Sequence, residues 1–454
     1  MSSGVGGAAH AGPDSEVPSS FDPDHGFGAH VTLDYDFSYR HSVIERETID
    51  GTATPGQDPT QLRREFIFSS QRHTIVPKIE LGIFHDVWIY GALPYVLTDS
   101  RQLEFDQQQT PCTFTGTEPA CVNRANSSTI ADGLLPMTGF DAHDPTVGFT
   151  DPSSALIFRG PDRSGLDQIY LGLGWAPMNQ RRDDTKPTWK LGAELRLAVG
   201  KVAKLDRTMP SRENGVGEGV DEIRLWTTFA RKRGWAEPYV ELSWQAPIGH
   251  TKDSPFNDPG FGARRTDKQQ EASVRAGFEA IAVDNQVDHE RFSLDFSGVA
   301  AAHFEGRAYS EMWEVFAFAG DAAGGGPLVL DADPTQSGVQ ALSHPGVSNV
   351  ENYLELGGRL SARAEIGSRV HLAAFGQFRG ETQHIISFTD AGVDLPTCTA
   401  NTTTGCEDES NEVVNPGTAE VNPLHVPIID LVGHRYRSVG AMTFDIGAEL
   451  QILF

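Results

Sequence analysis

The last twenty residues of the chain, Arg435 to Phe454, alternate with a period of two. Every second residue counted back from the end is uncharged: Phe454, Ile452, Leu450, Ala448, Ile446, Phe444, Met442 and Gly440. The opposite face carries Gln451, Glu449, Gly447, Asp445 and Thr443. A period of two predicts a β-strand whose two faces meet different surroundings. The strand is also long enough to cross a bilayer at a tilt.

The end of this strand resembles the terminal signal strand of bacterial outer-membrane β-barrels, in which a final Phe closes the last strand. The resemblance implies that Phe454, Ile452 and Leu450 form the signal for barrel assembly. It also implies two kinds of partner, the barrel-insertion machinery and the lipid of a Gram-negative outer membrane.

Alternating segments of this kind recur along the chain, and we count about 12 strands between residues 28 and 454. The connections between them alternate in length. Short connections lie near 85, 180, 233, 286 and 368, and long ones cover about 41–65, 98–164, 200–220, 249–268, 303–349 and 385–430. A soluble β-sandwich has no reason to alternate its loops in this way. The pattern predicts an all-β fold: one transmembrane antiparallel up-and-down β-barrel over 28–454, with short periplasmic turns and long extracellular loops.

The composition agrees with this prediction and excludes other classes. The 454 residues contain no apolar run of about 18 residues, so membrane-spanning helices are not expected. Asp and Glu number 62 against 36 Lys and Arg, so we expect no nucleic-acid partner. An acidic balance fits solubility, divalent cations or a cation-preferring pore. No cofactor is predicted.

The four cysteines form two close pairs within polar segments, Cys112 with Cys121 and Cys398 with Cys406. This spacing favours two local disulfides and therefore an oxidising compartment. A zinc site would need closer Cys spacing and neighbouring His residues. Both pairs fall in predicted extracellular loops.

Residues 1–27 are rich in Gly, Ala, Ser, Pro and Asp and predict a flexible periplasmic tail. Their first twenty residues have neither the basic start nor the apolar centre of a signal peptide. Because a barrel of this kind must be exported, we expect this chain to be a mature or engineered form.

Three segments carry a finer resemblance: IELGIFHDVWIYGALPY, SGLDQIYLGLGWAP and LGAELRLAVGK. They look like the porin-like outer-membrane barrels associated with meta-cleavage pathways of phenol degradation. The first hairpin motif of that family is matched by Glu80, Gly82, Leu93, Pro94 and Tyr95. Asp167 lies near the second motif but follows Ser164-Gly165-Leu166, and Ala198-Val199-Gly200 stands at the third. The resemblance covers roughly 75–250 and implies passage of small organic molecules, without assigning a role to any residue.

The charged face of the strands is the main candidate for function. The residues expected to line the lumen and set its selectivity are Asp34, Asp36, Glu80, Glu194, Arg196, Glu222, Arg224, Glu241, Arg275, Glu279, Glu355, Arg359, Arg363, Glu381, Asp445 and Glu449. They would form either a polar conduit with a mild preference for cations or a ladder of ion pairs that stiffens the barrel. A barrel of about 12 strands is expected to be narrow or plugged.

The segment Gly306–Gly320 breaks the strand pattern. Tyr309, Met312, Trp313 and Phe316 could share one face of a helix that plugs the barrel or binds a partner at its mouth. We favour the alternative that strands extend beyond the membrane, with these aromatic residues in the interfacial belt or packed on a loop. Asp141, His143 and Asp144 could bind calcium, but Asp and Pro are ordinary turn formers.

The chain shows no GxSxG, HExxH or Walker motif, and His303, His371 and His384 have no Ser in a recognisable motif. We therefore do not predict an enzyme. The first hypothesis is a passive outer-membrane channel for ions or small organic solutes. The second is a platform whose outer loops bind a partner protein, surface polymer or lattice neighbour. Ordered loops that seal the lumen would favour the platform, and an open water path would favour the channel.

Overall fold

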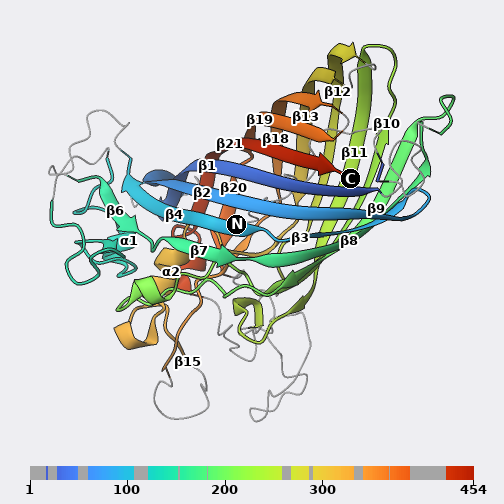
Figure 1. Ribbon diagram of the computed structural model, residues 1–454. Helices are drawn as coiled ribbons and strands as arrows, with labels where there is room; N and C mark the ends of the chain where they lie inside the picture. The colour runs from blue at the N-terminus through green and yellow to red at the C-terminus, as the bar shows by residue number, and fades with distance from the viewer. Residues whose placement is uncertain are drawn as a thin grey trace, which may run out of the picture.

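A computed structural model describes residues 17–18, 28–49, 60–106, 121–151, 154–180, 182–257, 267–285, 290–331, 341–367, 369–388 and 426–454. Within them one large sheet, whose wall strands all pair antiparallel, closes on itself as a barrel (Figure 1). Its strands are β1 (Ala29–Ile49), β2 (Thr60–Phe84), β3 (Val87–Ala92), β4 (Tyr95–Phe105), β7 (Arg163–Leu166), β8 (Gln168–Met178), β9 (Thr188–Ala198), β10 (Val220–Ala230), β11 (Ala236–His250), β12 (Glu271–Asn285), β13 (Glu290–His303), β18 (Tyr353–Ile366), β19 (Val370–Glu381) and β21 (Tyr436–Leu453).

These fourteen strands occupy twelve positions in the wall, because β3 with β4 and β7 with β8 each share one position. β3 ends before Leu93-Pro94, since Pro94 has no N–H to donate to a neighbouring strand. β1 pairs with β2 on one side and with β21 on the other, from His30 opposite Leu453 to Arg46 opposite Tyr436. The predicted closed antiparallel barrel is confirmed.

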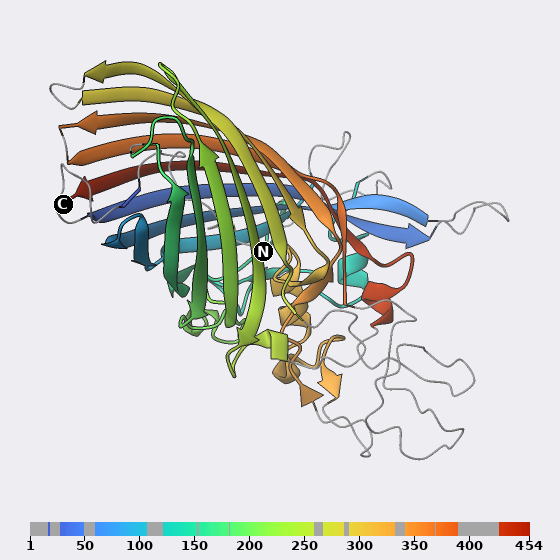
Figure 2. The same ribbon diagram turned by 90° about the vertical axis from the view of Figure 1, so that its right-hand side faces the viewer.

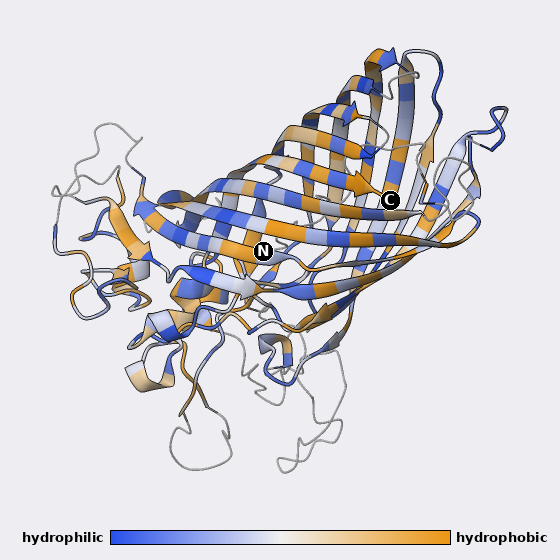
Figure 3. Cartoon of the chain, viewed as in Figure 1, coloured by the Kyte–Doolittle hydropathy of each residue, from blue (hydrophilic) through white to orange (hydrophobic). Residues whose placement is uncertain are grey.

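The two faces of the wall differ as the period of two requires. On β1, Val31, Leu33 and Tyr35 are exposed on the outside, whereas Thr32 and Asp34 are buried inside. Figure 3 shows the same alternation along the other strands of the wall. The exposed apolar side chains continue around the barrel and include Ile89, Leu171, Leu195, Leu225, Leu242, Phe278, Phe296, Leu360, Leu372 and Ile446. This arrangement, apolar outside and polar inside, is that of a transmembrane β-barrel. No helix in the described part is both long and apolar enough to cross a membrane.

The first predicted loop is mostly strand, so its predicted limits, 41–65, are wrong. β1 continues to Ile49 and β2 begins at Thr60, with a bulge between Ile44 and Glu45. Figure 2 shows this blue hairpin projecting past the barrel. The continuation of β1 and β2 beyond the membrane was not predicted, because strands were recognised by an uncharged outer face. A strand needs such a face only where it contacts lipid.

The short connections stand at one end of the barrel. β2 and β3 are separated by two residues and β18 and β19 by three, as predicted near 85 and 368. The described parts of the long connections gather at the other end, where Figure 1 places α1, α2 and β15. We call the described parts of this end, residues 121–151, 306–331, 341–350, 384–388 and 426–435, the cap.

The elements of the cap and its surroundings are short. They are α1 (Ser128–Ala131), β5 (Phe140–Asp141), β6 (Leu156–Arg159), β14 (Gly306–Ala308), α2 (Trp313–Ala319), β15 (Leu330–Asp331), β16 (Ala341–Leu342), β17 (Ser348–Val350), β20 (His384–Ser387) and α3 (Pro427–Asp430). Single 3-10 turns occur at Pro210–Arg212, Pro255–Asn257 and Ala322–Gly324.

The cap has an apolar core of its own. Phe66, Phe105 and Tyr436 contribute from strands of the wall, and Val315 and Phe316 contribute from α2. All five side chains are buried completely. The largest described apolar cluster therefore lies at the long-loop end, where the barrel strands extend to enclose it.

Candidate functional site

The residues predicted to line the lumen lie on the inner face of the wall. Asp34, Glu80, Glu194, Arg196, Glu222, Arg224, Glu279, Glu355, Arg359, Arg363 and Asp445 are buried, and Asp36, Glu241, Arg275, Glu381 and Glu449 are half-buried. Each occupies the strand position opposite to the exposed apolar residues. The predicted placement agrees with the structure, while their role in selectivity stays a prediction.

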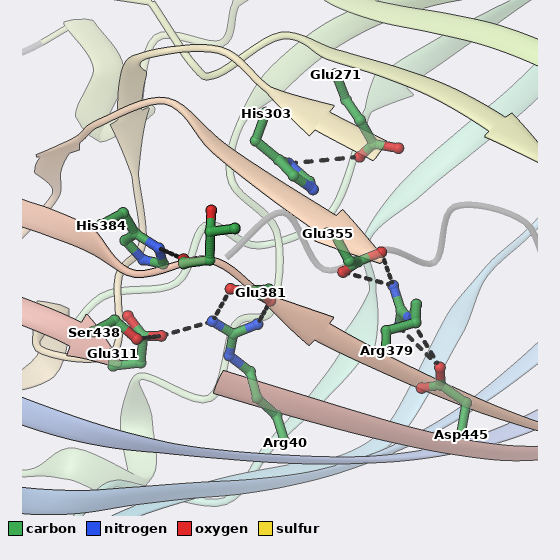
Figure 4. Close-up of polar contacts among 11 residues, drawn as sticks. Arg40, Glu271, His303, Glu311, Glu355, Arg379, Glu381, His384, Ser438 and Asp445 are labelled. Carbon is green, nitrogen blue, oxygen red and sulfur yellow. Dashed lines mark hydrogen bonds and ion pairs between the residues drawn. The ribbon is translucent and has the colours of Figure 1, made fainter. Parts of the chain in front are cut away.

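Most of these charges are engaged in ion pairs, some between neighbouring strands and some within one strand. Arg379 lies between Glu355 and Asp445, at 3.1 and 2.9 Å (Figure 4). Arg275 lies 3.1 Å from Asp295. Further pairs at 2.7 to 3.2 Å join Arg196 with Glu194, Lys78 with Glu80, Arg291 with Glu279 and Arg224 with Glu241. The inner wall thus contains the ladder of ion pairs that was one of the two interpretations.

A second part of the inner wall is aromatic. Trp88 and Tyr90 of β3 and Trp226 of β10 point inward, and the indole N–H of Trp226 donates to the Tyr90 hydroxyl at 3.3 Å. We call these three residues the aromatic floor. They lie near the short-turn end, because β3 begins directly after the turn at 85–86.

Glycines on neighbouring strands make room for the aromatic floor. Tyr90 is directly opposite Gly172, Trp88 is opposite Gly174, and Trp226 is opposite Gly192. A Cβ at Gly172 would lie 2.0 Å from the Tyr90 ring. The aromatic floor was not predicted from the sequence. The alternating glycines in YLGLGW were a usable signal, since a glycine in a strand often marks a close approach by another group.

One residue of the N-terminal segment packs on this floor. Val17 is 4% exposed and belongs to the cluster formed by Trp88, Tyr90, Ala176 and Trp226. This contact differs from the expected free periplasmic tail over 1–27. Only residues 17–18 of that segment are described, so its domain boundary stays a prediction.

The segment 306–320 contains a helix, α2, and all seven of its residues are buried. The favoured prediction of extended strands with belt aromatics is wrong. A helix is present, as the alternative expected, but Tyr309 and Met312 precede it and the four residues do not share one face. The suggested role as a plug or partner site stays a prediction. Met312 and Phe316 pack in the main core of the cap, whereas Tyr309 and Trp313 pack on the other side against Ala203 and Phe256. A seven-residue helix has a weak periodic signal in the sequence, and here its apolar residues pack against two different surfaces.

Glu311, just before α2, is held against the wall. Arg40 of β1 donates to Glu311 at 2.6 Å and also pairs with Glu381 of β19, and the Ser438 hydroxyl donates to Glu311 at 2.9 Å (Figure 4). Burial alone would raise the pKa of Glu311, but Arg40 and His384 lower it to about 2. The carboxylate therefore stays ionised and ties the cap to β1, β19 and β21.

Glu314 makes a second attachment on another part of the wall. Arg163 of β7 donates to Glu314 at 3.1 and 2.8 Å, and both residues are buried. The same guanidinium donates to the carbonyl oxygens of Glu213, Gly215 and Lys204. Gly160 makes this approach possible, since a Cβ there would lie 2.2 Å from the Glu314 carboxylate. α2 is thus fixed at both β1 and β7.

Three rings stack beside the Glu311 contact. His303 lies 4.3 Å from Tyr353, and Tyr353 lies 4.4 Å from His384, measured between ring centroids. Ser438 and His384 are cross-strand neighbours, but the Ser438 hydroxyl donates to Glu311, and Nδ1 of His384 lies 3.2 Å from the Thr382 carbonyl. The Ser438 hydroxyl therefore serves the attachment of the cap.

The loop considered for calcium is organised by protein contacts. Asp141 accepts from Arg159 Nε at 2.8 Å, and Asp144 accepts from the Thr146 hydroxyl. In the described part of the chain, no group of three or more His, Cys, Asp or Glu side chains is placed to hold a metal ion.

Of the four predicted disulfide residues, only Cys121 is described. It is 1% exposed and disulfide-bonded. Cys112, Cys398 and Cys406 lie outside the described residues, so the two predicted pairings stay predictions.

Comparison with solved structures finds outer-membrane proteins at very low identity and low TM-scores. An outer-membrane channel from Pseudomonas putida F1 is 8% identical, with a TM-score of 0.41, covering 98% of this chain and all of that one. A FadL homologue from Pseudomonas aeruginosa is 8% identical, with a TM-score of 0.32, over 93% and 89%. The outer-membrane protease OmpT from Escherichia coli is 9% identical, with a TM-score of 0.27, over 97% and 100%.

No protein-family model matches the chain. No curated protein matches it either. The chain is an all-β protein of the transmembrane β-barrel class, and this assignment follows from its own strand register and its apolar outer face.

Proposed function

We propose that the protein is an outer-membrane channel for ions or small organic solutes. The observation that carries the proposal is the contrast between the two faces of one closed wall. Leu33 and Leu450 face outward on β1 and β21, and Asp34 and Glu449 face inward at the neighbouring positions. Charged side chains on the inner face of a barrel line a path for polar solutes. In this arrangement the short turns are periplasmic and the cap is extracellular.

The sign of the inner charge supports a preference for cations. The predicted lining set contains eleven carboxylates and five guanidinium groups. Lys78 and Arg379 offset part of this excess through their ion pairs. Counter-ions concentrate in a cleft lined by one sign of charge. Cations are therefore expected to pass more readily than anions.

The cap makes this a channel with a closed resting state. α2 is attached to β1 through Glu311 and to β7 through Glu314, so it is held at two points of the wall at the cap end. Its apolar residues fill the core between these attachments. Solute passage in this proposal requires movement of α2 or of the loops packed on it.

The test is single-channel recording of the refolded protein in a planar bilayer under a salt gradient. We expect infrequent openings with a reversal potential of cation-preferring sign. Glu311→Gln should raise the open probability, since it removes the charge that Arg40 holds. A correctly folded barrel that stays silent in both forms would contradict the channel.

The second candidate is a platform on which the cap binds a partner protein or surface polymer. The ordered apolar core of the cap favours it, because a simple pore has no need of such a core. A protein that remains silent in bilayers while its cap retains protection from hydrogen exchange would support this alternative.

Assembly is expected to use the C-terminal signal. Ile452 pairs with Val31 and Val370, and the Phe454 N–H donates to the Ala29 carbonyl at 2.9 Å. Phe454 is exposed, as required of a residue that the insertion machinery contacts. Deletion of Phe454 should lower the yield of membrane-inserted barrel without preventing refolding in detergent.

A further inference from the structure

An open groove of about 720 Å³ lies on the outer face of the wall, where β12, β13, β18, β19 and β21 are neighbours (Figure 1). Three of its lining residues are small and adjacent: Ala276 is directly opposite Gly298, and Gly298 is directly opposite Gly358. We call these three residues the base of the groove. The volume of the groove is in the range of about 300–1,000 Å³ that is usual for ligand pockets.

Large apolar side chains form the rim of the groove. In the next row of outward positions, Phe278 is opposite Phe296, and Phe296 is opposite Leu360. The Phe278 and Phe296 rings are stacked with their centres 5.5 Å apart. Phe378, opposite Gly358, ends the row of small residues. All four rim residues are exposed, so the base of the groove lies below the side chains that surround it.

The packing of the wall does not require the glycines at the base. A Cβ at Gly358 would first meet a neighbour at 3.7 Å, and one at Gly298 at 4.0 Å, which are ordinary contact distances. The inner face differs, since a Cβ at Gly277 or Gly357 would lie 2.4 or 2.3 Å from a backbone oxygen. A glycine inside a strand weakens that strand. The absence of side chains at the base therefore points to a group outside the protein that fills the space.

The chemistry of the groove is apolar. Among the described residues that line it, the polar ones, Ser297, Arg359 and Gln377, alternate with the outward positions and direct their side chains inward. Ser297 and Arg359 are buried, and the Arg359 guanidinium lies 3.6 Å from the centre of the inward Phe375 ring. The surface around the groove is the lipid-facing side of the barrel, with Leu356 exposed beside it. A hydrocarbon therefore matches both the groove and its surroundings.

The position of the groove suits a chain that descends from the cap-side surface of the membrane. Gly298, Gly358 and Gly376 each occupy the third outward position from the cap end of their strand. The base is one residue wide and spans three strands, roughly 10 Å at a strand spacing of about 4.8 Å. Since barrel strands tilt by about 35–45°, a row across them is inclined to the membrane plane. A single acyl chain can lie along such a row.

We propose that the groove is a binding site for one acyl chain of a membrane lipid in the leaflet on the cap side. The chain lies on Gly298 and Gly358 and contacts the Phe296 and Phe378 rings. Its affinity comes from close packing, because the surrounding lipid is as apolar as the groove. The inference goes beyond the proposed channel, since it requires only the membrane-spanning wall.

Photolabelling locates the bound chain. The refolded protein is placed in dimyristoyl phosphatidylcholine vesicles with a trace of the same lipid that carries a diazirine in the middle of one chain, and labelled peptides are identified by mass spectrometry. The groove peptides of β13 and β18 should be labelled about tenfold more than the peptide with Leu225, as on the order of ten additional carbon contacts would give. Leu225 is exposed at the third outward position from the cap end of β10. Equal labelling would mean ordinary lipid contact and would overturn the site.

Variants on the outer face separate the groove from its surroundings. Gly298→Leu combined with Gly358→Leu fills the base and should reduce labelling of β13 and β18 to the level of β10. Gly358→Ala alone should give an intermediate reduction. The matched control is Gly380→Leu on β19, an outward glycine outside the groove, where a Cβ would first meet a neighbour at 3.9 Å. Loss of the preference in Gly380→Leu, or its persistence in the filled variant, would contradict the assignment.

Bilayer recording keeps this site apart from the proposed channel. The filled variant should conduct as the wild-type protein does, because the groove and the lumen lie on opposite faces of the wall. Preferential labelling in a protein that passes no current would reject the channel and keep the site. A current without preferential labelling would keep the channel and reject the site.

Discussion

The lumen and the cap are two interiors of one chain with opposite polarity. In the lumen Arg379, Glu355 and Asp445 point inward and the apolar residues face out. In the cap the apolar residues, including Phe316 and Tyr436, point inward as in a soluble domain. β1 belongs to both, since its inner face carries Asp34 in the wall and Ile44 in the cap core.

This difference shows what surrounds each half of a strand. Within the membrane, the outer face of β1 at Leu33 is apolar because it contacts lipid, and the charged residues lie on the inner face. Beyond the lipid no outer apolar face is needed, and the inner face at Ile44 can build a dry core. The inner face of β1 is therefore polar within the membrane and apolar beyond it. The two interiors should respond differently to the same kind of change.

The largest effect is expected from removing a charge partner in the dry cap. Arg163→Met leaves Glu314 buried without a cation, and loss of one partner of a buried pair costs about 3–5 kcal/mol. Hydrogen exchange of the α2 backbone should accelerate by roughly two to four orders of magnitude. Exchange of β12 and β13 should not change, since neither strand contacts this pair. Unchanged protection of α2 would show that the Arg163 attachment does not hold the cap.

The second-largest effect is expected on the stability of the cap when the pH is lowered. Burial lowers the pKa of His344 to about 3, and its Nδ1 accepts from the Gly346 N–H at 2.9 Å while Arg307 adds repulsion. The unfolded cap binds the proton near pH 6.5 and the folded cap does not. Stability is thus complete above about pH 6.5 and is lost as pH falls toward 3, by about 2–3 kcal/mol at pH 4.5.

This prediction is checked by hydrogen exchange of the cap at pH 7 and pH 4.5, after correction for the intrinsic exchange rate. His344→Asn keeps an acceptor for Gly346 and should abolish the difference. Glu311 is no confounder in this window, because a pKa of about 2 in the folded state means its contribution is lost only below about 4.5. A difference that persists in His344→Asn would assign the effect to another group.

The sequence predicted the wall well and the cap poorly, for a physical reason. Strand faces follow a period of two set by the backbone, so Asp34 and Leu450 could be placed without any contact information. In the sequence, Glu311 and Glu314 resemble solvent-exposed charges in a short apolar segment. They can be buried because Arg40 and Arg163, which are distant in sequence, pair with them. Their attachment depends on tertiary contacts that a local pattern does not contain.

The candidate site divides in the same way. The inward position of Arg359 followed from the alternation of β18. The lack of hydrogen-bond partners for its Nε and Nη2 atoms did not, because Arg379 has the same inward position on its strand and is fully paired. Trp88 and Tyr90 disturbed the apolar alternation of β3, and the glycines that accommodate them lie about eighty residues later. Cross-strand complementarity of this kind becomes visible only once the register is known.

A smaller effect is expected where the lumen is packed as tightly as the cap. At the aromatic floor, Gly172→Ala would place a Cβ 2.0 Å from the Tyr90 ring, and such overpacking costs about 1–3 kcal/mol. The matched control is Gly376→Ala on β19, where a Cβ meets nothing within 4 Å and the change should stay within about 0.5 kcal/mol. Urea unfolding midpoints of the two variants measure the difference, and equal midpoints would contradict close packing of the floor.

The smallest effect on stability is expected from the lumen counterpart of the first change. Arg379→Met removes the cation between Glu355 and Asp445, as Arg163→Met does for Glu314. The Arg379 side chain is 13% exposed, against 1% for Arg163, and its partners are 9% and 8% exposed, against 4% for Glu314, so this group is closer to water than the cap pair. The cost should be about 1 kcal/mol or less, as for solvated pairs. The reversal potential should move further toward cation preference, because one positive charge has left the path.

A loss of about 3–5 kcal/mol at both sites would instead mean that the lumen is as dry as the cap. In that case the charges of the wall would serve the stability of the barrel rather than the passage of solutes.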